Sequence, residues 1–159
     1  MGPIDVQLTI ADFAAAPSEQ LLRELMANLP ELTVSHAGLT VPEQAEVSVY
    51  VTDDAEMAQL NGSFRKKPEP TNVLSFPTRQ VAVGEMPLPV LGDLVFSWST
   101  VIREATEQDK LLADHFKHLF VHGLLHLFGY DHISDDEATQ MEQLEVTILA
   151  SMGLENPYQ

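Results

Sequence analysis

Residues 122–132 read HGLLHLFGYDH, and this run decides how the chain folds around it and which chemistry it can carry. His122 and His126 are four positions apart, so on a helix their imidazoles lie on one face and can bind the same metal ion. Gly129 is expected to end that helix, because glycine adopts the backbone conformation of a helix C-terminus without strain. The chain can then fold back and bring His132 to the same ion.

Three histidines without a fourth protein ligand are typical of a catalytic zinc site, where the open coordination position takes water or substrate. The chain contains no cysteine, which fits a reducing compartment and leaves histidine and carboxylate as the plausible metal ligands. Copper and nickel bind imidazole more tightly than zinc does, but an open site without redox ligands favours zinc in a cell. We therefore predict one zinc ion per chain, held by His122, His126 and His132.

Other polar residues near the run have less certain roles. His118 either orients a metal ligand from behind or packs without a role at the site, and His115 is expected to face solvent or to cap a neighbouring group. Asp131 has two interpretations: it accepts a hydrogen bond from a ligand histidine, or it caps the turn before His132. His36 lies in a predicted polar loop and is assigned no function.

The residue after His122 is Gly123, and this position separates two kinds of zinc enzyme. In peptidases of the HExxHxxGxxH type a glutamate stands there and deprotonates the zinc-bound water. Glycine cannot do so, which directs attention to phosphodiester cleavage, where the transition state carries extra negative charge on phosphoryl oxygens. A guanidinium stabilises such charge, and Arg65 in the predicted loop 63–70 can supply one. An ordinary surface role for this arginine remains the alternative.

The composition predicts one globular domain and limits its partners. The chain has 159 residues, of which 45% are apolar and 20% charged, so residues 1–159 suit a single domain with a real core. A net charge of −16 argues against nonspecific nucleic-acid binding by bulk electrostatics. Half of the eight basic residues nevertheless lie close together, which makes one face locally positive unless the clustering is accidental; they are Arg65, Lys66, Lys67 and Arg79.

No segment predicts insertion into a membrane. The longest apolar stretch, residues 119–128, is interrupted by two histidines and is much shorter than the roughly 20 residues that a spanning helix needs. The N-terminus, MGPIDVQL, has neither the basic start and apolar core of a signal peptide nor the pattern for myristoylation. We therefore expect a cytoplasmic protein without a membrane partner.

Hydrophobic periodicity predicts four strands and five helices. Strands are expected at residues 4–10, 45–51, 71–76 and 91–97. Helices are expected from Ser18 to a stop at Pro30, from Asp53 or Asp54 to Asn61-Gly62, over 99–108, over 111–128, and from the cap at Ser134 to Gly153. This order indicates one mixed sheet of about four strands with packed helices, an α/β or α+β domain. The helix that carries His122 is apolar on most sides and is therefore expected to be central.

Three blocks of the sequence resemble the YbeY family of bacterial zinc-dependent single-strand endoribonucleases, which act in ribosomal RNA maturation. The blocks are NGSFRKKPEPTNVLSFP (residues 61–77), LGDLVFS (91–97) and HLFVHGLLHLFGYDHISDDEATQMEQLE (118–145). The resemblance runs from about Val47 to the C-terminus. It implies a zincin-like metal helix beside a mixed sheet, with zinc ligands at His122, His126 and His132. The family's functional arginine falls on Arg65.

The resemblance also extends to residues around the site and to the substrate. Arg65 would bind the scissile phosphate, and Lys66 would make a second contact with the substrate, with Lys67 beside it. The matching positions Asn72, Ser75, Gly92 and Asp93 are interpreted as lining the cleft or as structural. The implied substrate is single-stranded RNA within a ribosomal RNA precursor, with small-subunit components as partners.

The expected function is therefore a metal-dependent endoribonuclease domain over residues 1–159 that processes the 3′ end of 16S rRNA and contributes to ribosome quality control. Two alternatives belong to other functional classes. One is a zinc metallopeptidase with an unusual base, and the other is a non-enzymatic ribosome-assembly factor whose zinc ion only stabilises the fold.

Overall fold

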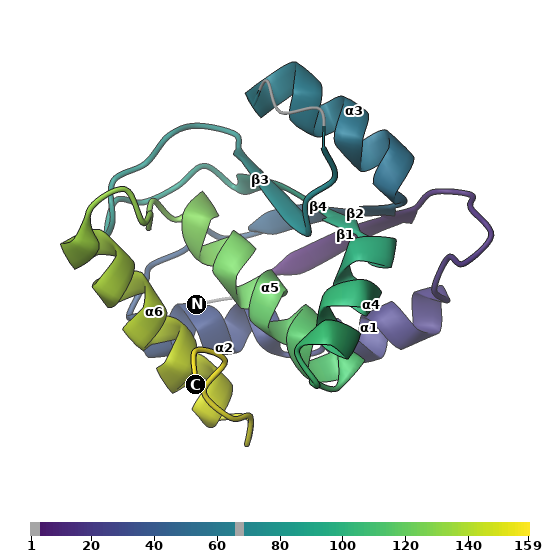
Figure 1. Ribbon diagram of the computed structural model, residues 1–159. Helices are drawn as coiled ribbons and strands as arrows, with labels where there is room; N and C mark the ends of the chain where they lie inside the picture. Colours follow the sequence, from purple (N-terminus) through teal and green to yellow (C-terminus); the bar gives the residue numbers. More distant parts are fainter. Residues whose placement is uncertain (1–3, 66–68) are drawn as a thin grey trace.

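The computed structural model describes residues 4–65 and 69–159, without the side chains of Phe64 and Arg65. The four predicted strands are confirmed, and six helices accompany them (Figure 1). In chain order the elements are β1 (Asp5–Ile10), α1 (Glu19–Met26), α2 (Leu29–Ala37), β2 (Glu46–Thr52), α3 (Asp54–Arg65), β3 (Val73–Pro77), β4 (Val90–Ser97), α4 (Trp98–Glu107), α5 (Leu112–Leu127) and α6 (Asp135–Ala150).

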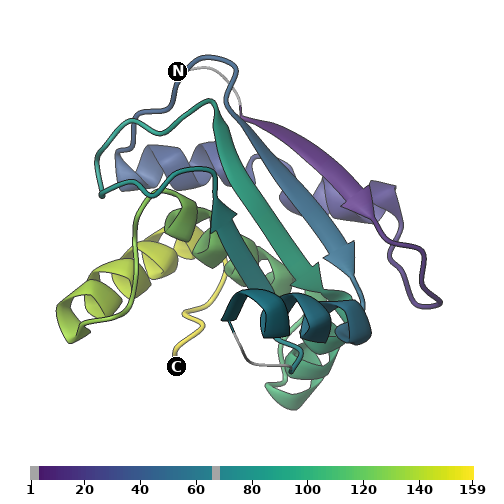
Figure 2. The ribbon, with the colours of Figure 1, turned by 90° about the horizontal axis from the view of Figure 1, so that it is seen from above.

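The strands form one mixed sheet in the order β1-β2-β4-β3, which is visible from above in Figure 2. The pairs β1–β2 and β2–β4 are parallel, whereas β3 runs antiparallel to β4. The predicted α/β class with a mixed sheet of about four strands is therefore confirmed. Within the described part of the chain, β3 pairs with β4 alone, so its other edge is left free of sheet pairing. This edge borders the site described below.

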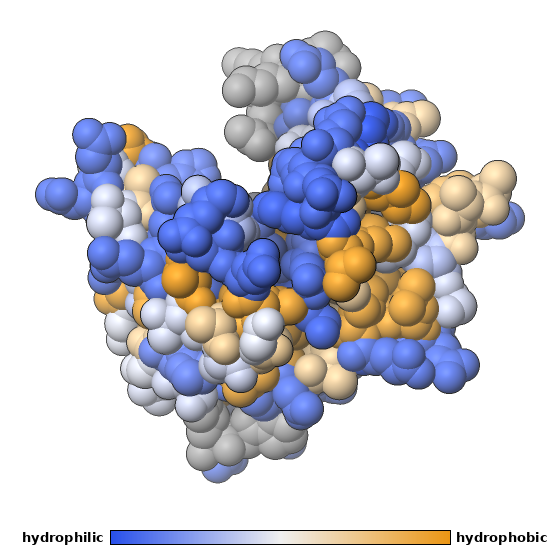
Figure 3. Space-filling view, turned by 60° about the horizontal axis from the view of Figure 1, so that its bottom comes forward, coloured by the Kyte–Doolittle hydropathy of each residue, from blue (hydrophilic) through white to orange (hydrophobic). Residues whose placement is uncertain are grey.

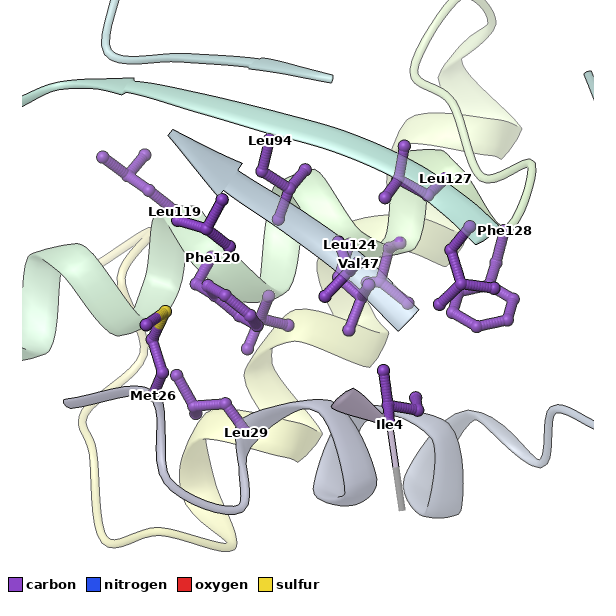
Figure 4. Close-up of a cluster of buried hydrophobic side chains, with 14 of the residues drawn as sticks. Ile4, Met26, Leu29, Val47, Leu94, Leu119, Phe120, Leu124, Leu127 and Phe128 are labelled. Atoms are coloured by element: carbon purple, nitrogen blue, oxygen red, sulfur yellow. The ribbon is translucent and has the colours of Figure 1, made fainter. Parts of the chain in front are cut away.

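The helices cover the two faces of the sheet unequally. Helix α3 lies on one face, and the other five helices lie on the opposite face (Figures 1 and 2). Helix α5 is central, as its apolar sequence predicted: it contacts β3 and β4 as well as α1, α2, α4 and α6. Side chains from α5 meet those of β2, β4 and the N-terminal helices in the core (Figure 4), among them the fully buried Phe120 and Leu124. A smaller cluster beneath α3 contains Met57, Leu74 and Val95.

The segment predicted as one helix up to Pro30 is in fact two helices. Ser18 caps α1 as expected, since its Oγ accepts a hydrogen bond from the backbone N–H of Leu21 at 3.1 Å. Pro30, however, begins α2 rather than stopping a helix, because proline fits the first turn, where its missing N–H is not needed. His36 accordingly lies near the end of α2 and not in a loop.

The predicted end of the next helix at Asn61-Gly62 is also wrong, because α3 continues to Arg65. The Asn61 side chain is buried and its Nδ2 donates to the backbone oxygen of Glu69 at 2.8 Å. Asparagine followed by glycine signals a turn by local preference, but here a contact with a later part of the chain uses the asparagine, and the backbone stays helical. Arg65 is thus the last residue of a helix and not part of a loop.

No helix within the described residues is long and apolar enough to cross a membrane. The face shown in Figure 3 is mainly hydrophilic, with apolar side chains gathered in a smaller region.

The turn after α5 depends on Gly129, which has a φ of +100°. A Cβ atom at this position would overlap the carbonyl oxygen of Val81 and would lie 3.0 Å from the backbone nitrogen of Val83. Glycine is therefore required both for the backbone conformation and for the close approach of the β3–β4 connection.

We predict that Gly129→Ala lowers the free energy of unfolding by more than Gly38→Ala does. Gly38 is the matched control, because it has a φ of +64° but no atom within 4 Å of the point that a Cβ would occupy. The control should lose about 1–2 kcal/mol from the left-handed backbone alone, while Gly129→Ala adds the steric overlap. Urea unfolding of both variants tests this; equal losses would show that contact with the β3–β4 connection contributes nothing.

Candidate metal centre

The three predicted ligands meet at the C-terminal end of α5. His122 and His126 lie one helical turn apart, and their Nε2 atoms are 3.1 Å from each other. The turn at Gly129 returns the chain so that the His132 ring centroid lies 5.6 Å from that of His122 and 5.1 Å from that of His126. One ring nitrogen from each histidine lies within 4.8 Å of the other two, a spacing that allows one ion to bind all three.

The second nitrogen of each helical histidine is already used. His126 Nδ1 donates to the backbone oxygen of Tyr130 at 2.8 Å, and His122 Nδ1 donates to Glu145 Oε2 at 3.1 Å. Both acceptors lack a proton to give, so the neutral rings carry their lone pairs on Nε2. Two lone pairs 3.1 Å apart repel each other unless a cation lies between them. The donor set therefore fits a metal ion.

Glu145 is a fully buried carboxylate that supports this arrangement from α6. Its Oε1 accepts hydrogen bonds from His118 Nε2 at 2.6 Å and from the Tyr158 hydroxyl at 2.7 Å, in addition to the bond from His122. Burial by itself raises the pKa of Glu145, but these hydrogen bonds outweigh it and lower the pKa to about 2. The group is thus a carboxylate near neutral pH, and its hydrogen bond fixes the orientation of the His122 ring.

The surroundings of His126 favour the neutral form that a metal requires. Burial lowers the pKa of His126, and the proximity of His122 lowers it further, against a smaller opposite effect of the hydrogen bond to Tyr130. Since a metal and a proton compete for the same nitrogen, a lowered pKa favours the metal.

The structure also decides the roles of the neighbouring polar residues. His118 lies behind the ligands, because it shares Glu145 with His122. Of the two expectations for His115, exposure to solvent is wrong, because the residue is buried. The contact of its Nε2 with Glu104 Oε1 at 2.9 Å agrees with the other, an interaction with a neighbouring group. Asp131 caps the turn, since its Oδ1 accepts the backbone N–H of His132 at 2.8 Å.

Glu145 and Tyr158 were missed by the sequence reasoning. Glu145 occupies the buried side of α6 between Met141 and Ile148, both fully buried. A carboxylate on the apolar side of a helix is costly without partners, so this pattern could have indicated a polar partner in the core. Nothing in the sequence around Tyr158 signals that the C-terminal segment returns to α6.

The ligands open into a cleft of about 830 Å³ between α5 and the free edge of β3. This volume is within the range of roughly 300–1,000 Å³ that is typical of ligand sites. Its lining mixes polar and apolar residues with few charged groups. Besides the three histidines it comprises Thr71, Asn72, Val73, Leu74, Ser75, Pro77, Gln80, Val81, His118, Leu119, Gly129, Tyr130, Asp131, Ile133 and Tyr158. Gly92 and Asp93 are not among the described residues that line it.

Gly123 has a steric role besides the chemical one inferred from sequence. A Cβ at this position would lie 3.0 Å from Leu94 Cδ2 and 3.2 Å from Ser75 Oγ. The Ser75 hydroxyl donates to the backbone oxygen of Gly123 at 3.1 Å, which joins β3 to α5 directly beside His122. A side chain at this position would therefore need the side chains of Leu94 and Ser75 to shift by a few tenths of an ångström.

The basic residues can be placed only in part. Arg65 ends α3, but its side chain lies outside the described part of the structure, as do Lys66 and Lys67 as a whole. The bond from Asn61 to Glu69 holds the chain that follows them beside α3, shortly before the cleft residue Thr71. Arg79 donates to the backbone oxygen of Met86 within the β3–β4 connection.

Comparison with known proteins gives consistent matches. The family model described as Endoribonuclease YbeY matches residues 11–153. A protein named endoribonuclease YbeY from Sinorhizobium fredii is 44% identical over 99% of this chain and 94% of its own length. A protein with the same name from Bartonella bacilliformis is 42% identical over 98% of this chain and 97% of its own length. The solution structure of TM1509 from Thermotoga maritima shares the fold, with a TM-score of 0.54 at 19% identity over 97% of this chain and 99% of that one.

We predict that Glu145→Gln weakens zinc binding by about 10- to 100-fold, because the amide no longer offers two anionic oxygens to His118, His122 and Tyr158. Glu142→Gln is the matched control: it removes the same charge from the same helix, at a residue that is only partly buried. Competition with a chromophoric chelator measures the affinity, and circular dichroism checks the fold. Equal affinities of the two variants would contradict a supporting role of Glu145.

Proposed function

The chain belongs to the YbeY family of endoribonucleases, and we propose that it cleaves single-stranded RNA at a zinc ion bound by His122, His126 and His132. The observation that carries the proposal is the convergence of three ring nitrogens within 4.8 Å at the floor of an open cleft. Three imidazoles leave a coordination position for substrate, as catalytic zinc sites do, whereas structural zinc sites close with four protein ligands.

The protein's own groups have separable tasks in this proposal. His122 and His126 offer Nε2 because Glu145 and the Tyr130 carbonyl hold their Nδ1 protons. When bound, zinc acts as a Lewis acid toward a phosphoryl oxygen and lowers the pKa of water. With Gly123 next to His122, α5 provides no carboxylate base at the peptidase position.

Arg65 is proposed to bind the scissile phosphate, with Lys66 as a second contact. A guanidinium can form two parallel hydrogen bonds with phosphate oxygens and stabilises the charge that develops during cleavage. The position of Arg65 at the end of α3, on the chain that leads to the cleft residues Thr71 and Asn72, supports this role.

The proposed setting is ribosomal RNA maturation in the cytoplasm. The substrate would be a ribosomal RNA precursor near the 3′ end of 16S rRNA, presented with small-subunit components, and residues 1–159 would act as one domain. The alternatives of a metallopeptidase and of a non-enzymatic assembly factor are not favoured, because the matching relatives are named endoribonucleases.

We predict that His126→Ala loses both the metal and the activity. Purified protein should contain about one zinc ion per chain, and the variant close to none, as measured by elemental mass spectrometry. Cleavage of a single-stranded RNA oligonucleotide should fall by more than about 100-fold, since even residues that only support a ligand are worth up to that factor. His36→Ala, an exposed histidine on α2, should keep both properties. Equal cleavage by both variants would point to a contaminating nuclease.

A second prediction concerns Arg65→Ala. The rate of cleavage should fall by about 100- to 1,000-fold, the usual effect of removing one donor to a charged transition state, while the zinc content stays unchanged. Lys117→Ala removes a positive charge from α5 and serves as the control. A variant that retains full cleavage would exclude Arg65 from the reaction, and retained cellular function with metal-dependent folding would favour the assembly factor.

A further inference from the structure

The free edge of β3 forms one wall of the cleft, and its main-chain hydrogen-bonding groups have no role in the proposed function. Consecutive residues from Thr71 to Ser75 line the cleft. Side chains of a strand alternate between the two faces of its sheet, so a run of consecutive residues can border one cavity only along the edge of the strand. The main chain of β3 therefore forms part of the cleft wall.

The pairing with β4 determines which main-chain groups point into the cleft. Ser97 donates its N–H to the oxygen of Asn72, and Thr78 donates its N–H to the oxygen of Leu91. In an antiparallel pair the hydrogen-bonded residues alternate. With the observed register, the even-numbered residues of β3 therefore pair with β4, and the N–H and C=O groups of Val73, Ser75 and Pro77 point away from it.

Only one of these outward N–H groups remains for a ligand. The N–H of Val73 donates to the side-chain oxygen of Asn72 at 2.7 Å. Pro77 has no N–H. The N–H of Ser75 has no partner among the described residues. Along this edge the cleft thus presents three carbonyl oxygens and a single N–H, and the N–H and C=O of Ser75 lie side by side.

We infer that Ser75 binds an unpaired nucleobase of the RNA through its main-chain N–H and C=O. Phosphate oxygens only accept hydrogen bonds, so they have no use for the carbonyl groups of Val73, Ser75 and Pro77. The Watson–Crick edge of every base, in contrast, carries a donor beside an acceptor, which matches the pair offered by Ser75. This inference rests on the proposed function and identifies what its substrate must display.

The position and charge of the site agree with this inference. The Ser75 hydroxyl is bound to the oxygen of Gly123, directly after the ligand His122, so a base at Ser75 belongs to a nucleotide next to the metal. A chain with a net charge of −16 gains little from general attraction to phosphates, so uncharged hydrogen bonds must contribute to binding. The contact also explains selection of single strands, because in a duplex the Watson–Crick edge is occupied.

The test compares Ser75→Pro with Ser75→Ala in the zinc-loaded full chain. Both variants lose the hydroxyl bond to Gly123, but only proline removes the N–H, and proline is tolerated at an edge-strand position whose N–H faces away from the sheet. We expect the dissociation constant for a single-stranded DNA, which presents base edges without a 2′-hydroxyl, to rise about 5- to 100-fold for Ser75→Pro relative to Ser75→Ala. Equal constants would overturn the inference.

An abasic series identifies the partner of Ser75. Oligonucleotides that each lack one base are bound to Ser75→Pro and to Ser75→Ala. At one position, the loss of binding free energy caused by the missing base and the loss caused by proline in place of alanine should not be additive. Additive losses at every position would overturn the inference. Because binding is measured without cleavage, this result is independent of the His126→Ala and Arg65→Ala experiments.

Amide exchange provides the measurement if Ser75→Pro does not fold. In the unmodified protein, the Ser75 amide should exchange more slowly with deuterated water, and its NMR resonance should shift, when the single strand is added. The same strand annealed to its complement should have neither effect. An unchanged Ser75 amide in the presence of saturating single strand would contradict the contact.

Discussion

The close packing of α5 against β3 is the constraint on which the rest of the structure depends. A glycine at position 123 favours it, because a Cβ there would lie 3.0 Å from Leu94 Cδ2 and 3.2 Å from Ser75 Oγ, and the hydrogen bond from Ser75 to the oxygen of Gly123 completes it. The same contact places His122 and His126, two of the proposed metal ligands, on one side of a cleft and the free edge of a strand on the other. Gly123, which in the sequence indicates that a catalytic base is missing, therefore also contributes to the shape of the cleft.

The metal centre is built on a helix that is buried on nearly all sides. Its neighbours include the other helices on that face of the sheet, and α6 contributes the carboxylate of Glu145. Taking a carboxylate out of water is costly, but three hydrogen-bond donors compensate it here and lower its pKa. Rigid ligands held by buried partners keep the histidines oriented toward one point before the metal arrives.

The cleft reconciles an acidic protein with a nucleic-acid substrate. General electrostatic attraction is weak at a net charge of −16. Few charged side chains line the cleft. Its lining includes residues of β3, among them Ser75, and the preceding Asn72. In the proposed mode of binding, the metal, a few local cations and hydrogen bonds to the bases replace the overall charge as the source of recognition.

The sequence by itself determined the features that depend on neighbours along the chain. The placement of His122 and His126 on one face of a helix, the turn at Gly129 and the alternation in β1 and β2 follow from local geometry, and the structure agrees with each of them. Local reasoning failed where a distant contact overrides a local preference, as at Asn61-Gly62, and where a proline can both end and begin a helix, as at Pro30.

Only the tertiary structure decided which groups meet across the chain. Glu145 contacts His122 from another helix, and the outward direction of the Ser75 N–H depends on the register between β3 and β4. These pairings are set by packing between elements, because a shift of one residue in register or a small rotation of a helix leaves the local sequence pattern unchanged and exchanges every contact.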